Sequence, residues 1–353
     1  MQRLRLAFLG VDHPHGADWR ELLLNFDAQI QVTAIVPGFD GATTSLEERL
    51  SAATRFENVS ELISVGEFDA ALVCLPNNET PTVVCQLAQA GKHVLVEKPG
   101  AACAADALEI VEAVKKSNIA LQTGYGWRYD EGGNRLREMV RQGRFGKLIS
   151  IEMTFVTSDV NCRGPDHYLF RRDVSGGGYF NWLACHFLDL LLYVTGQAVV
   201  AVTARTGVFG SAPVEVEDGG VAILDLEGGG IATLLGGYWL PRWAGETHWC
   251  IRGSQRWVHW NADRPGTGGV LEIHGPKPQW HAMEETFTVP EDLTRGYGGR
   301  NGVALVNDWL TAIREGSRTC RNTPDSMLKA LQLLDTIDQA SKEGRRIECR
   351  IEP

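Results

Sequence analysis

The chain has 353 residues, 44% of them hydrophobic and 22% charged, which predicts about two globular domains and excludes a disordered or low-complexity protein. The formal net charge of -10 repels phosphate backbones and anionic lipid, so neither nucleic acid nor a membrane is an expected partner. No apolar run approaches the ~20 residues of a membrane span, and the stretch after Arg3 and Arg5 stops at Asp12, too soon for a signal peptide. We therefore expect a cytoplasmic location.

The first third of the chain alternates short apolar runs with stretches of helical periodicity. Strands are predicted at residues 4–10, 31–36, 70–75, 93–96 and 120–123, and helices at 18–26, 45–53, 82–90 and 104–117. This alternation is typical of an α/β fold with a doubly wound parallel sheet, in which ligands bind at the carboxyl ends of the strands. We assign residues 1–124 to a Rossmann dinucleotide-binding domain.

The rest of the chain, residues 125–353, predicts an α/β domain for substrate binding and dimerisation. Strands at 147–156, 198–206, 219–225, 231–237 and 249–252 are separated by glycine-rich turns, which favours an open, mostly antiparallel sheet. Helical periodicity returns over residues 302–315 and 324–342, where Thr323 is the expected N-cap and Pro324 the first helical residue. We expect these last helices, about 302–342, to pack across the domain junction.

Tryptophan is abundant in the second domain. Aromatic rings of this kind favour interfaces, and they also suit the apolar faces of sugars. We interpret most of them as a sheet or subunit interface of a homo-dimer or homo-tetramer, with a carbohydrate platform as the alternative. The set is Trp239, Trp243, Trp249, Trp257, Trp260 and Trp280.

The turn after the first strand lies where a dinucleotide-binding fold has its G-x-G-x-x-G motif. Gly10 matches the first glycine, but Asp12 replaces the second and His15 the third. A carboxylate there would repel a phosphate, in which case Asp12→Gly should strengthen nucleotide binding. Alternatively, Asp12 caps the next helix and Pro14 starts it. A metal pair formed by His13 and His15 with Asp12 is a minor alternative.

The loop after the second strand bears on the choice of cofactor. Pro37 stands where an NAD-binding fold commonly carries the acid that holds the ribose hydroxyls, and Asp40 can substitute for it. No arginine follows the strand to receive a 2′-phosphate, which favours NAD, although NADP is not excluded. The eight cysteines contain no C-x-x-C pair, so we expect neither a disulfide framework nor a metal site.

Three further motifs carry a resemblance to a known family. They are Leu75-Pro76-Asn77, the run from Gly91-Lys92-His93-Val94 to Glu97-Lys98-Pro99, and Gly176-Gly177-Gly178 followed by His186-Phe187-Leu188-Asp189. Together they resemble the Gfo/Idh/MocA oxidoreductases, over essentially the whole chain. The resemblance implies a Rossmann domain followed by an α/β domain with an open sheet, and NAD-dependent chemistry.

The resemblance also implies roles for individual residues. Lys98 corresponds to the lysine that contacts the nicotinamide ribose and the substrate hydroxyl, His186 to the catalytic histidine, and Asp189 to the acid that follows it. The alternative for Asp189 is that it orients His186. We expect Lys98 and His186 to converge on one substrate hydroxyl. The expected cofactor-binding residues are Gly10, Asp12, His15, Asp40, Pro76, Asn77, Glu97, Lys98 and Pro99.

The chain departs from the family pattern near the expected catalytic helix. Trp182 stands in place of the aspartate that precedes the histidine by four residues, so His186 is the expected principal acid-base group. Trp182, Arg128 and Arg171 are the expected substrate contacts.

The sequence therefore predicts an NAD(P)-dependent oxidoreductase that acts on a hydroxyl of a sugar, polyol or cyclitol. A redox-neutral glycosidase or lyase with tightly bound NAD is one alternative. A non-catalytic sensor of a nucleotide or sugar on the same scaffold is another.

Overall fold

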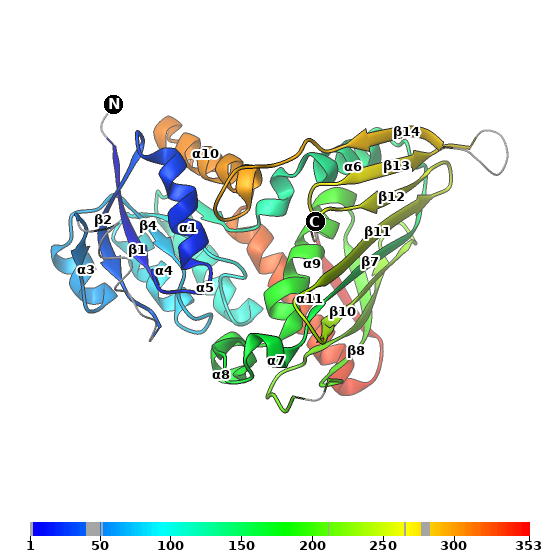
Figure 1. Ribbon diagram of the computed structural model, residues 1–353, viewed down its shortest axis with the longest axis horizontal. Coiled ribbons are helices and arrows are strands. Elements are labelled where there is room, and N and C mark those ends of the chain that lie inside the picture. The colour runs from blue at the N-terminus through cyan, green and yellow to red at the C-terminus, as the bar shows by residue number, and fades with distance from the viewer. Residues whose placement is uncertain (1–2, 40–49, 51, 211, 265, 277–282) are drawn as a thin grey trace. The chain divides into compact units, whose positions relative to one another are not determined.

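The computed structural model describes residues 3–39, 50, 52–210, 212–264, 266–276 and 283–353. The chain forms two compact units (Figure 1). The first unit comprises Met1–Gly126 and Leu293–Leu328, and the second comprises Trp127–Asp292 and Lys329–Pro353.

A six-stranded parallel sheet forms the centre of the first unit, in the order β3-β2-β1-β4-β5-β6. The strands are β1 (Leu4–Leu9), β2 (Ile30–Val36), β3 (Thr54–Arg55), β4 (Ala70–Val73), β5 (His93–Val96) and β6 (Leu121–Thr123). The helices are α1 (Gly16–Leu23), η1 (Leu24–Phe26), α3 (Val59–Val65), α4 (Thr80–Gln89), α5 (Ala104–Lys116) and α10 (Gly299–Glu315). This arrangement confirms the predicted doubly wound fold. The helix expected at residues 45–53 falls almost entirely outside the described residues.

The end of β1 packs closely against the end of β4. Gly10 has φ +71°, and a Cβ atom added there would lie 2.0 Å from the carbonyl oxygen of Cys74. Only glycine combines this backbone conformation with so close an approach. The first glycine of the turn is therefore fixed by packing within the sheet, independently of any ligand.

Residues 293–328 cluster with the first unit, which differs from the expected division at residue 124. The polar groups of α10 and the loop after it complete the edge strand β6. Gln122 Nε2 donates to the carbonyl of Leu305 at 3.1 Å, and Asn322 Nδ2 donates to the carbonyls of Thr123 at 2.9 Å and Tyr125 at 3.0 Å. Asn322 thus satisfies two backbone carbonyls at and after the end of β6, and Gln122 satisfies one carbonyl of α10.

The helix α11 (Pro324–Glu343) begins as the sequence predicts. Thr323 Oγ1 accepts a hydrogen bond from the backbone N–H of Ser326 at 3.1 Å, and Pro324 is the first helical residue. These two features confirm the predicted N-cap and first-turn proline.

A nine-stranded sheet forms the second unit, in the order β14-β13-β12-β11-β7-β10-β9-β8-β15. Among the described strand pairs of this nine-stranded sheet, only β7 and β10 are parallel. The predicted open, mostly antiparallel sheet is therefore confirmed. The strands are β7 (Leu148–Ser158), β8 (Val199–Gly207), β9 (Gly219–Leu226), β10 (Ile231–Leu240), β11 (Gly245–Gly253), β12 (Trp257–Asn261), β13 (Val270–His274), β14 (Met283–Thr288) and β15 (Ile347–Ile351).

Helices cover one face of this sheet. Phe187 on α9 stacks its ring on Phe155 of β7 and on Trp249 of β11, with centroids 5.8 Å apart in both pairs. The helical segments are η2 (Gly126–Tyr129), α6 (Glu131–Arg141), α7 (Val160–Arg163), η3 (Tyr168–Phe170), α8 (Arg172–Ser175), the π-helical turn η4 (Phe180–Ala184), α9 (Cys185–Thr195) and most of α11. No helix in the described part of the chain is long and apolar enough to cross a membrane.

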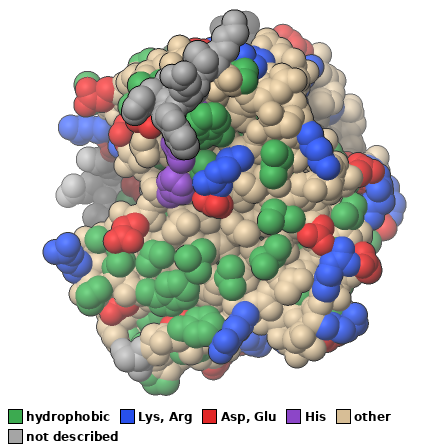
Figure 2. Space-filling model, turned by 90° about the vertical axis from the view of Figure 1, so that its right-hand side faces the viewer, with side chains coloured by type: hydrophobic (Ala, Val, Ile, Leu, Met, Phe, Trp, Pro, Cys, Tyr) green, Lys and Arg blue, Asp and Glu red, His purple; other side chains and the backbone are tan. Residues whose placement is uncertain are grey.

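The other face of the sheet is open, and the expected tryptophan set is divided, because Trp239 of β10 and Trp257 of β12 are half-buried while other members lie elsewhere. Trp249 and Trp260 are buried in the core, Trp243 lies exposed in the turn after β10, and Trp280 is outside the described residues. The side chains exposed on this face are instead aliphatic, and hydrophobic groups gather over part of the surface in Figure 2. We call this set the aliphatic patch: Ile149, Val221, Ile223, Ile231 and Leu235.

Candidate functional site

Asp12 holds together two loops at the carboxyl edge of the first sheet. Its carboxylate oxygens accept hydrogen bonds from the backbone N–H groups of Gly38, at 2.8 Å, and Phe39, at 3.0 Å. The helix α1 begins only at Gly16, so the prediction that Asp12 caps this helix and Pro14 starts it is wrong. Because two amides already compensate the carboxylate, its charge is less of an obstacle to a phosphate than the sequence alone suggests. Asp40 is outside the described residues.

Glu97, directly after β5, is the centre of a buried polar cluster. Its carboxylate accepts a hydrogen bond from Trp19 Nε1 and lies 3.4 Å from His15 Nδ1 and 3.1 Å from the hydroxyl of Tyr297. The ring of Tyr297 stacks on Trp19 with centroids 4.1 Å apart. The Glu97 cluster, defined as these four residues, joins the turn after β1, helix α1, strand β5 and the segment before α10.

The Glu97 carboxylate is ionised despite its burial. Burial alone would raise its pKa, but the opposing influence of His15, followed by Lys98 and His13, lowers the pKa to about 2. Opposite charges and a hydrogen bond thus outweigh the cost of desolvation. A negative charge is therefore fixed beside Lys98 at neutral pH.

Lys98 is buried at the carboxyl end of β5, and its peptide bond to Pro99 is cis. Its backbone nitrogen approaches Gly124 closely, since a Cβ atom added to Gly124 would lie 3.3 Å away. Asn77, also buried, follows β4. The carbonyl of Pro76 accepts a hydrogen bond from Thr80 Oγ1 at 3.0 Å, which fixes the turn into α4.

These residues fit a dinucleotide in their position and chemistry. Gly10, Asn77 and Lys98 follow the neighbouring strands β1, β4 and β5, and the strand order reverses between β1 and β4. The crevice outside such a reversal is where doubly wound sheets bind nucleotides. A tight glycine turn, a buried amide and a buried cation supply groups suited to phosphate and ribose.

In the second unit, His186 lies flat against an aromatic ring that the sequence analysis missed. Its imidazole, on α9, stacks on Trp127 with centroids 4.5 Å apart and planes 18° apart. His186 is almost fully buried. Trp127 fixes the plane of the His186 ring. The sequence points to Trp127 only through its position directly before Arg128, an expected substrate contact.

Asp189 is held by Arg128. Nε of Arg128 donates to one carboxylate oxygen at 2.8 Å and Nη2 to the other at 2.6 Å, a bidentate pair with both side chains buried. Burial raises the pKa of Asp189, and the charge of Arg128 opposes this shift. The structure thus brings together two predicted site residues, with Arg128 positioning Asp189 on the helix that carries His186.

The glycine run before α9 packs against Glu217, which the sequence analysis also missed. A Cβ atom on Gly178 would lie 2.0 Å from the carbonyl oxygen of Glu217. The side chain of Glu217 accepts hydrogen bonds from the backbone N–H groups of Gly178 at 2.8 Å and Phe180 at 3.1 Å, and burial raises its pKa. Glycine is therefore needed here for the close approach of Glu217, which anchors the segment leading to His186.

The remaining predicted substrate contacts differ in environment. Trp182 is buried in the π-helical turn and meets the ring of Tyr168 edge-on, with centroids 6.1 Å apart. Arg171 is exposed and forms an ion pair with Asp173 at 2.9 Å. Trp182 is thus part of the packed segment before His186, whereas Arg171 lies at the surface.

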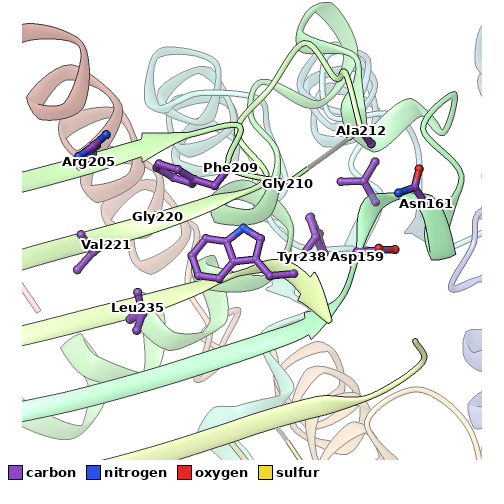
Figure 3. A pocket seen from close by; sticks show the side chains of 12 residues that line it. Asp159, Asn161, Arg205, Phe209, Gly210, Ala212, Gly220, Val221, Leu235 and Tyr238 are labelled. Atoms are coloured by element: carbon purple, nitrogen blue, oxygen red, sulfur yellow. The ribbon is translucent and has the colours of Figure 1, made fainter. Parts of the chain in front are cut away.

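A separate hollow of about 710 Å³ opens at the ends of β8–β10 in the second unit (Figure 3). Its described lining includes Arg205, Tyr238 and Trp239, and none of the predicted site residues. Trp239 Nε1 donates to Asp218 at 3.0 Å, which fixes the indole in the wall. The hollow is therefore distinct from both groups of predicted residues.

Comparisons with known proteins agree with this architecture. Residues 4–125 match the model of the oxidoreductase family with an NAD-binding Rossmann fold, and residues 134–259 match the GFO/IDH/MocA C-terminal domain. A myo-inositol 2-dehydrogenase of Thermotoga maritima is 32% identical over 159 residues, which cover 45% of this chain and 46% of the relative. A levoglucosan dehydrogenase of Pseudarthrobacter phenanthrenivorans is 24% identical over 184 residues, covering 46% and 47%.

Among solved structures, a levoglucosan dehydrogenase in complex with NADH and levoglucosan has a TM-score of 0.86 at 17% identity and covers 98% of this chain and 99% of that one. At this identity the likeness concerns the fold. The chain spans about half the length of the curated relatives it matches. The two family models, however, together cover most of the sequence, and the chain belongs to the Gfo/Idh/MocA oxidoreductase family.

Proposed function

We propose that the protein is an NAD(H)-dependent oxidoreductase that acts on a hydroxyl group of a sugar, polyol or cyclitol. The observation that carries this proposal is the buried Lys98 next to the ionised Glu97, at the carboxyl end of β5 in an NAD-binding domain. Relatives named inositol 2-dehydrogenase and levoglucosan dehydrogenase support the substrate class.

Lys98 supplies positive charge to the reacting hydroxyl. A bound nicotinamide would supply hydride chemistry at the carbon that carries the hydroxyl, and the hydroxyl oxygen gives up its proton before or together with the hydride, or regains it in the reverse direction. A buried ammonium stabilises the negative charge that develops on this oxygen, and it does so without reorganisation of water. The charge of Lys98 is one of the influences that lower the pKa of Glu97, so the two side chains attract each other inside the protein.

His186 exchanges the proton of the hydroxyl. Its ring is held in one plane by Trp127, and the Arg128–Asp189 pair fixes the helix that carries it. Imidazole is suited to this role near neutral pH. Asp189 and Arg128 act in this account as positioning residues, whereas Trp182 and Arg171 remain proposed substrate contacts.

NADH binding tests the role of Asp12. Asp12→Gly removes the carboxylate that accepts hydrogen bonds from two backbone N–H groups. Each such hydrogen bond contributes roughly 1 kcal/mol, so we expect the affinity for NADH to fall by about tenfold or more. Asp12→Asn keeps one acceptor oxygen and should lose less. Titration followed by tryptophan fluorescence measures the dissociation constants, with the exposed Asp27→Asn as a control for net charge.

Tighter binding by Asp12→Gly would show that repulsion dominates at this turn and would contradict the anchoring role. Absence of saturable binding of both NADH and NADPH to the unmodified protein would overturn the proposed cofactor.

Kinetics test the roles of Lys98 and His186. Lys98→Met and His186→Ala should each lower turnover roughly a hundredfold or more, while NADH affinity changes little. The double variant should be hardly slower than the slower single variant, because members of one catalytic unit are not additive. Turnover is measured on a substrate found by screening sugars, polyols and cyclitols.

Lys92→Met is the matched control, since Lys92 precedes the opposite end of β5 and its Nζ donates to the carbonyl of Phe68; turnover should be unchanged. Near-normal turnover of His186→Ala would refute the assignment of the proton-transfer group.

We further propose that the protein is a homo-dimer or homo-tetramer that associates through the aliphatic patch. Contiguous apolar surface of this kind is unusual on a monomer, and a self-complementary face suits twofold symmetry. The exposed residues lie on the adjacent strands β7, β9 and β10. These strands can thus present an aliphatic surface to a second copy of the chain.

Light scattering at micromolar concentration tests this association. Leu235→Asp should shift the protein to the monomer, because the interface would have to bury a carboxylate. Leu108→Asp, on α5 of the first unit, is the control, since the two leucines are similarly exposed at 43% and 46%. A monomeric unmodified protein would contradict the proposal.

A further inference from the structure

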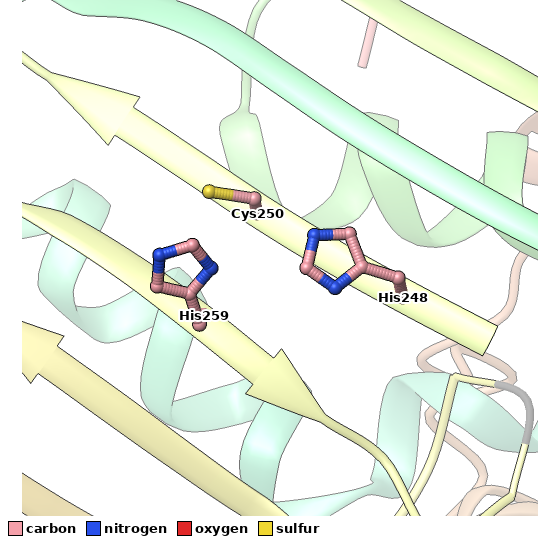
Figure 4. Close-up of side chains that lie close together, drawn as sticks. All are labelled: His248, Cys250 and His259. Carbon is pink, nitrogen blue, oxygen red and sulfur yellow. The ribbon is translucent and has the colours of Figure 1, made fainter.

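Three potential metal ligands lie together on the open face of the second unit, and none of them is a predicted site residue. His248 and Cys250 are two residues apart on β11, so their side chains share one side of the sheet. Cys250 is the register partner of His259 on the neighbouring strand β12. Figure 4 shows the three side chains grouped over these two strands.

Their donor atoms are nearly close enough to share one ion. One ring nitrogen of each histidine and the sulfur of Cys250 all lie within 4.8 Å of one another. In a tetrahedral zinc site, bonds of about 2.0–2.3 Å place neighbouring ligand atoms roughly 3.3–3.8 Å apart. Rotations of the side chains that move the donor atoms by about 1 Å bring them to this separation. The hydrogen-bonded pairing of β11 with β12 holds the backbone in place meanwhile.

The chemistry of the three donors selects the kind of ion. A thiolate and two imidazoles suit borderline-soft cations such as Zn²⁺, whereas Mg²⁺ and Ca²⁺ require oxygen ligands. Cys250 is fully buried and the two histidines are half-buried. A cation can therefore enter past the imidazoles and meet the sulfur at the base of the cluster.

The surroundings of the cluster favour a cation more than the sequence suggests. The nearby guanidinium of Arg252 is neutralised by Glu152, with Nη1 and Oε1 2.7 Å apart. His274 on β13 faces His259 with ring centroids 5.7 Å apart, and its buried Nε2 has no hydrogen-bond partner among the described residues. A third imidazole thus lies next to His259, one of the three donors.

We propose that His248, Cys250 and His259 form a binding site for Zn²⁺, with the fourth coordination position taken by water. The expectation of no metal site came from the absence of C-x-x-C pairs, a spacing suited to zinc knuckles. Here the ligands come from a His-x-Cys pair on one strand and a histidine across the ladder, which only the register reveals. The site goes beyond the proposed oxidoreductase function and takes no part in it.

Cobalt spectroscopy of the full-length protein tests this site. Titration of the reduced, metal-free protein with Co²⁺ should give one bound ion per chain, a thiolate-to-cobalt charge-transfer band in the near ultraviolet and the visible bands of tetrahedral cobalt. Zn²⁺ should displace the cobalt and abolish these bands. Cys250→Ser should remove the charge-transfer band, and His248→Asn and His259→Asn should each weaken binding by roughly tenfold or more.

Cys349→Ser is the matched control, because Cys349 is a half-buried thiol on another strand of the same sheet, β15. It should leave the cobalt spectrum unchanged. Circular dichroism of each variant without metal verifies that the fold is retained. The proposal is overturned if the unmodified protein shows no charge-transfer band, if the band persists in Cys250→Ser, or if neither histidine variant weakens binding.

Discussion

The structure of the first unit depends on one buried, ionised carboxylate. Glu97 can remain charged inside the protein only because His15, Trp19 and Tyr297 surround its oxygens and Lys98 follows it in the chain. His15 and Trp19 come from the start of α1, and Tyr297 comes from the segment before α10. Removing any of them would leave a buried charge incompletely compensated, at a cost of several kcal/mol. The requirement to satisfy Glu97 therefore fixes the carboxyl edge of the sheet, where Lys98 is presented.

Carboxylates with several hydrogen-bond donors also hold other loops of the protein. Asp12 accepts hydrogen bonds from two backbone N–H groups after β2. Glu217 accepts hydrogen bonds from two backbone N–H groups at the glycine run before α9, and Asp218 accepts them from the backbone N–H groups of Phe209 and Gly210. Carboxylates bound to backbone amides hold irregular segments more firmly than apolar contacts alone. Loops of this kind can carry binding residues in defined positions without belonging to a helix or strand.

Much of the fold could be predicted from the sequence, because parallel strands buried on both faces appear as continuous apolar runs. The strand at residues 93–96 and the start of α11 coincide with the structure. Strands β12, β13 and β14 were not predicted, although β12 and β13 alternate buried and half-buried residues as a half-buried strand does; β14 has no buried residue. Their place in the sheet depends on pairing with β11, which local sequence does not encode.

Residues of the candidate site could be predicted only where they belong to a recognisable sequence motif. Lys98 and His186 are recognisable because the resemblance covers their neighbours in sequence. Tyr297 beside Glu97 and Trp127 beside His186 are not, since each joins segments far apart in the chain. The hydrogen-bond partners of Asp12 were likewise not predictable, because Gly38 and Phe39 follow a different strand. Partners of this type appear only once the fold is known.

Unfolding of Glu97→Gln across a range of pH tests the central claim most directly. The pKa of Glu97 is about 2 in the folded protein against an ordinary value of 4.5, so its ionisation contributes stability above pH 4.5 that is lost as the pH falls towards 2. Glu97→Gln should therefore lower the free energy of unfolding in urea by roughly 3 kcal/mol at pH 7, and by clearly less at pH 3. The exposed Glu67→Gln should change it by less than about 0.5 kcal/mol. If Glu97→Gln is as stable as the unmodified protein at pH 7, or if its deficit does not shrink at pH 3, the ionised carboxylate does not hold this edge of the sheet together.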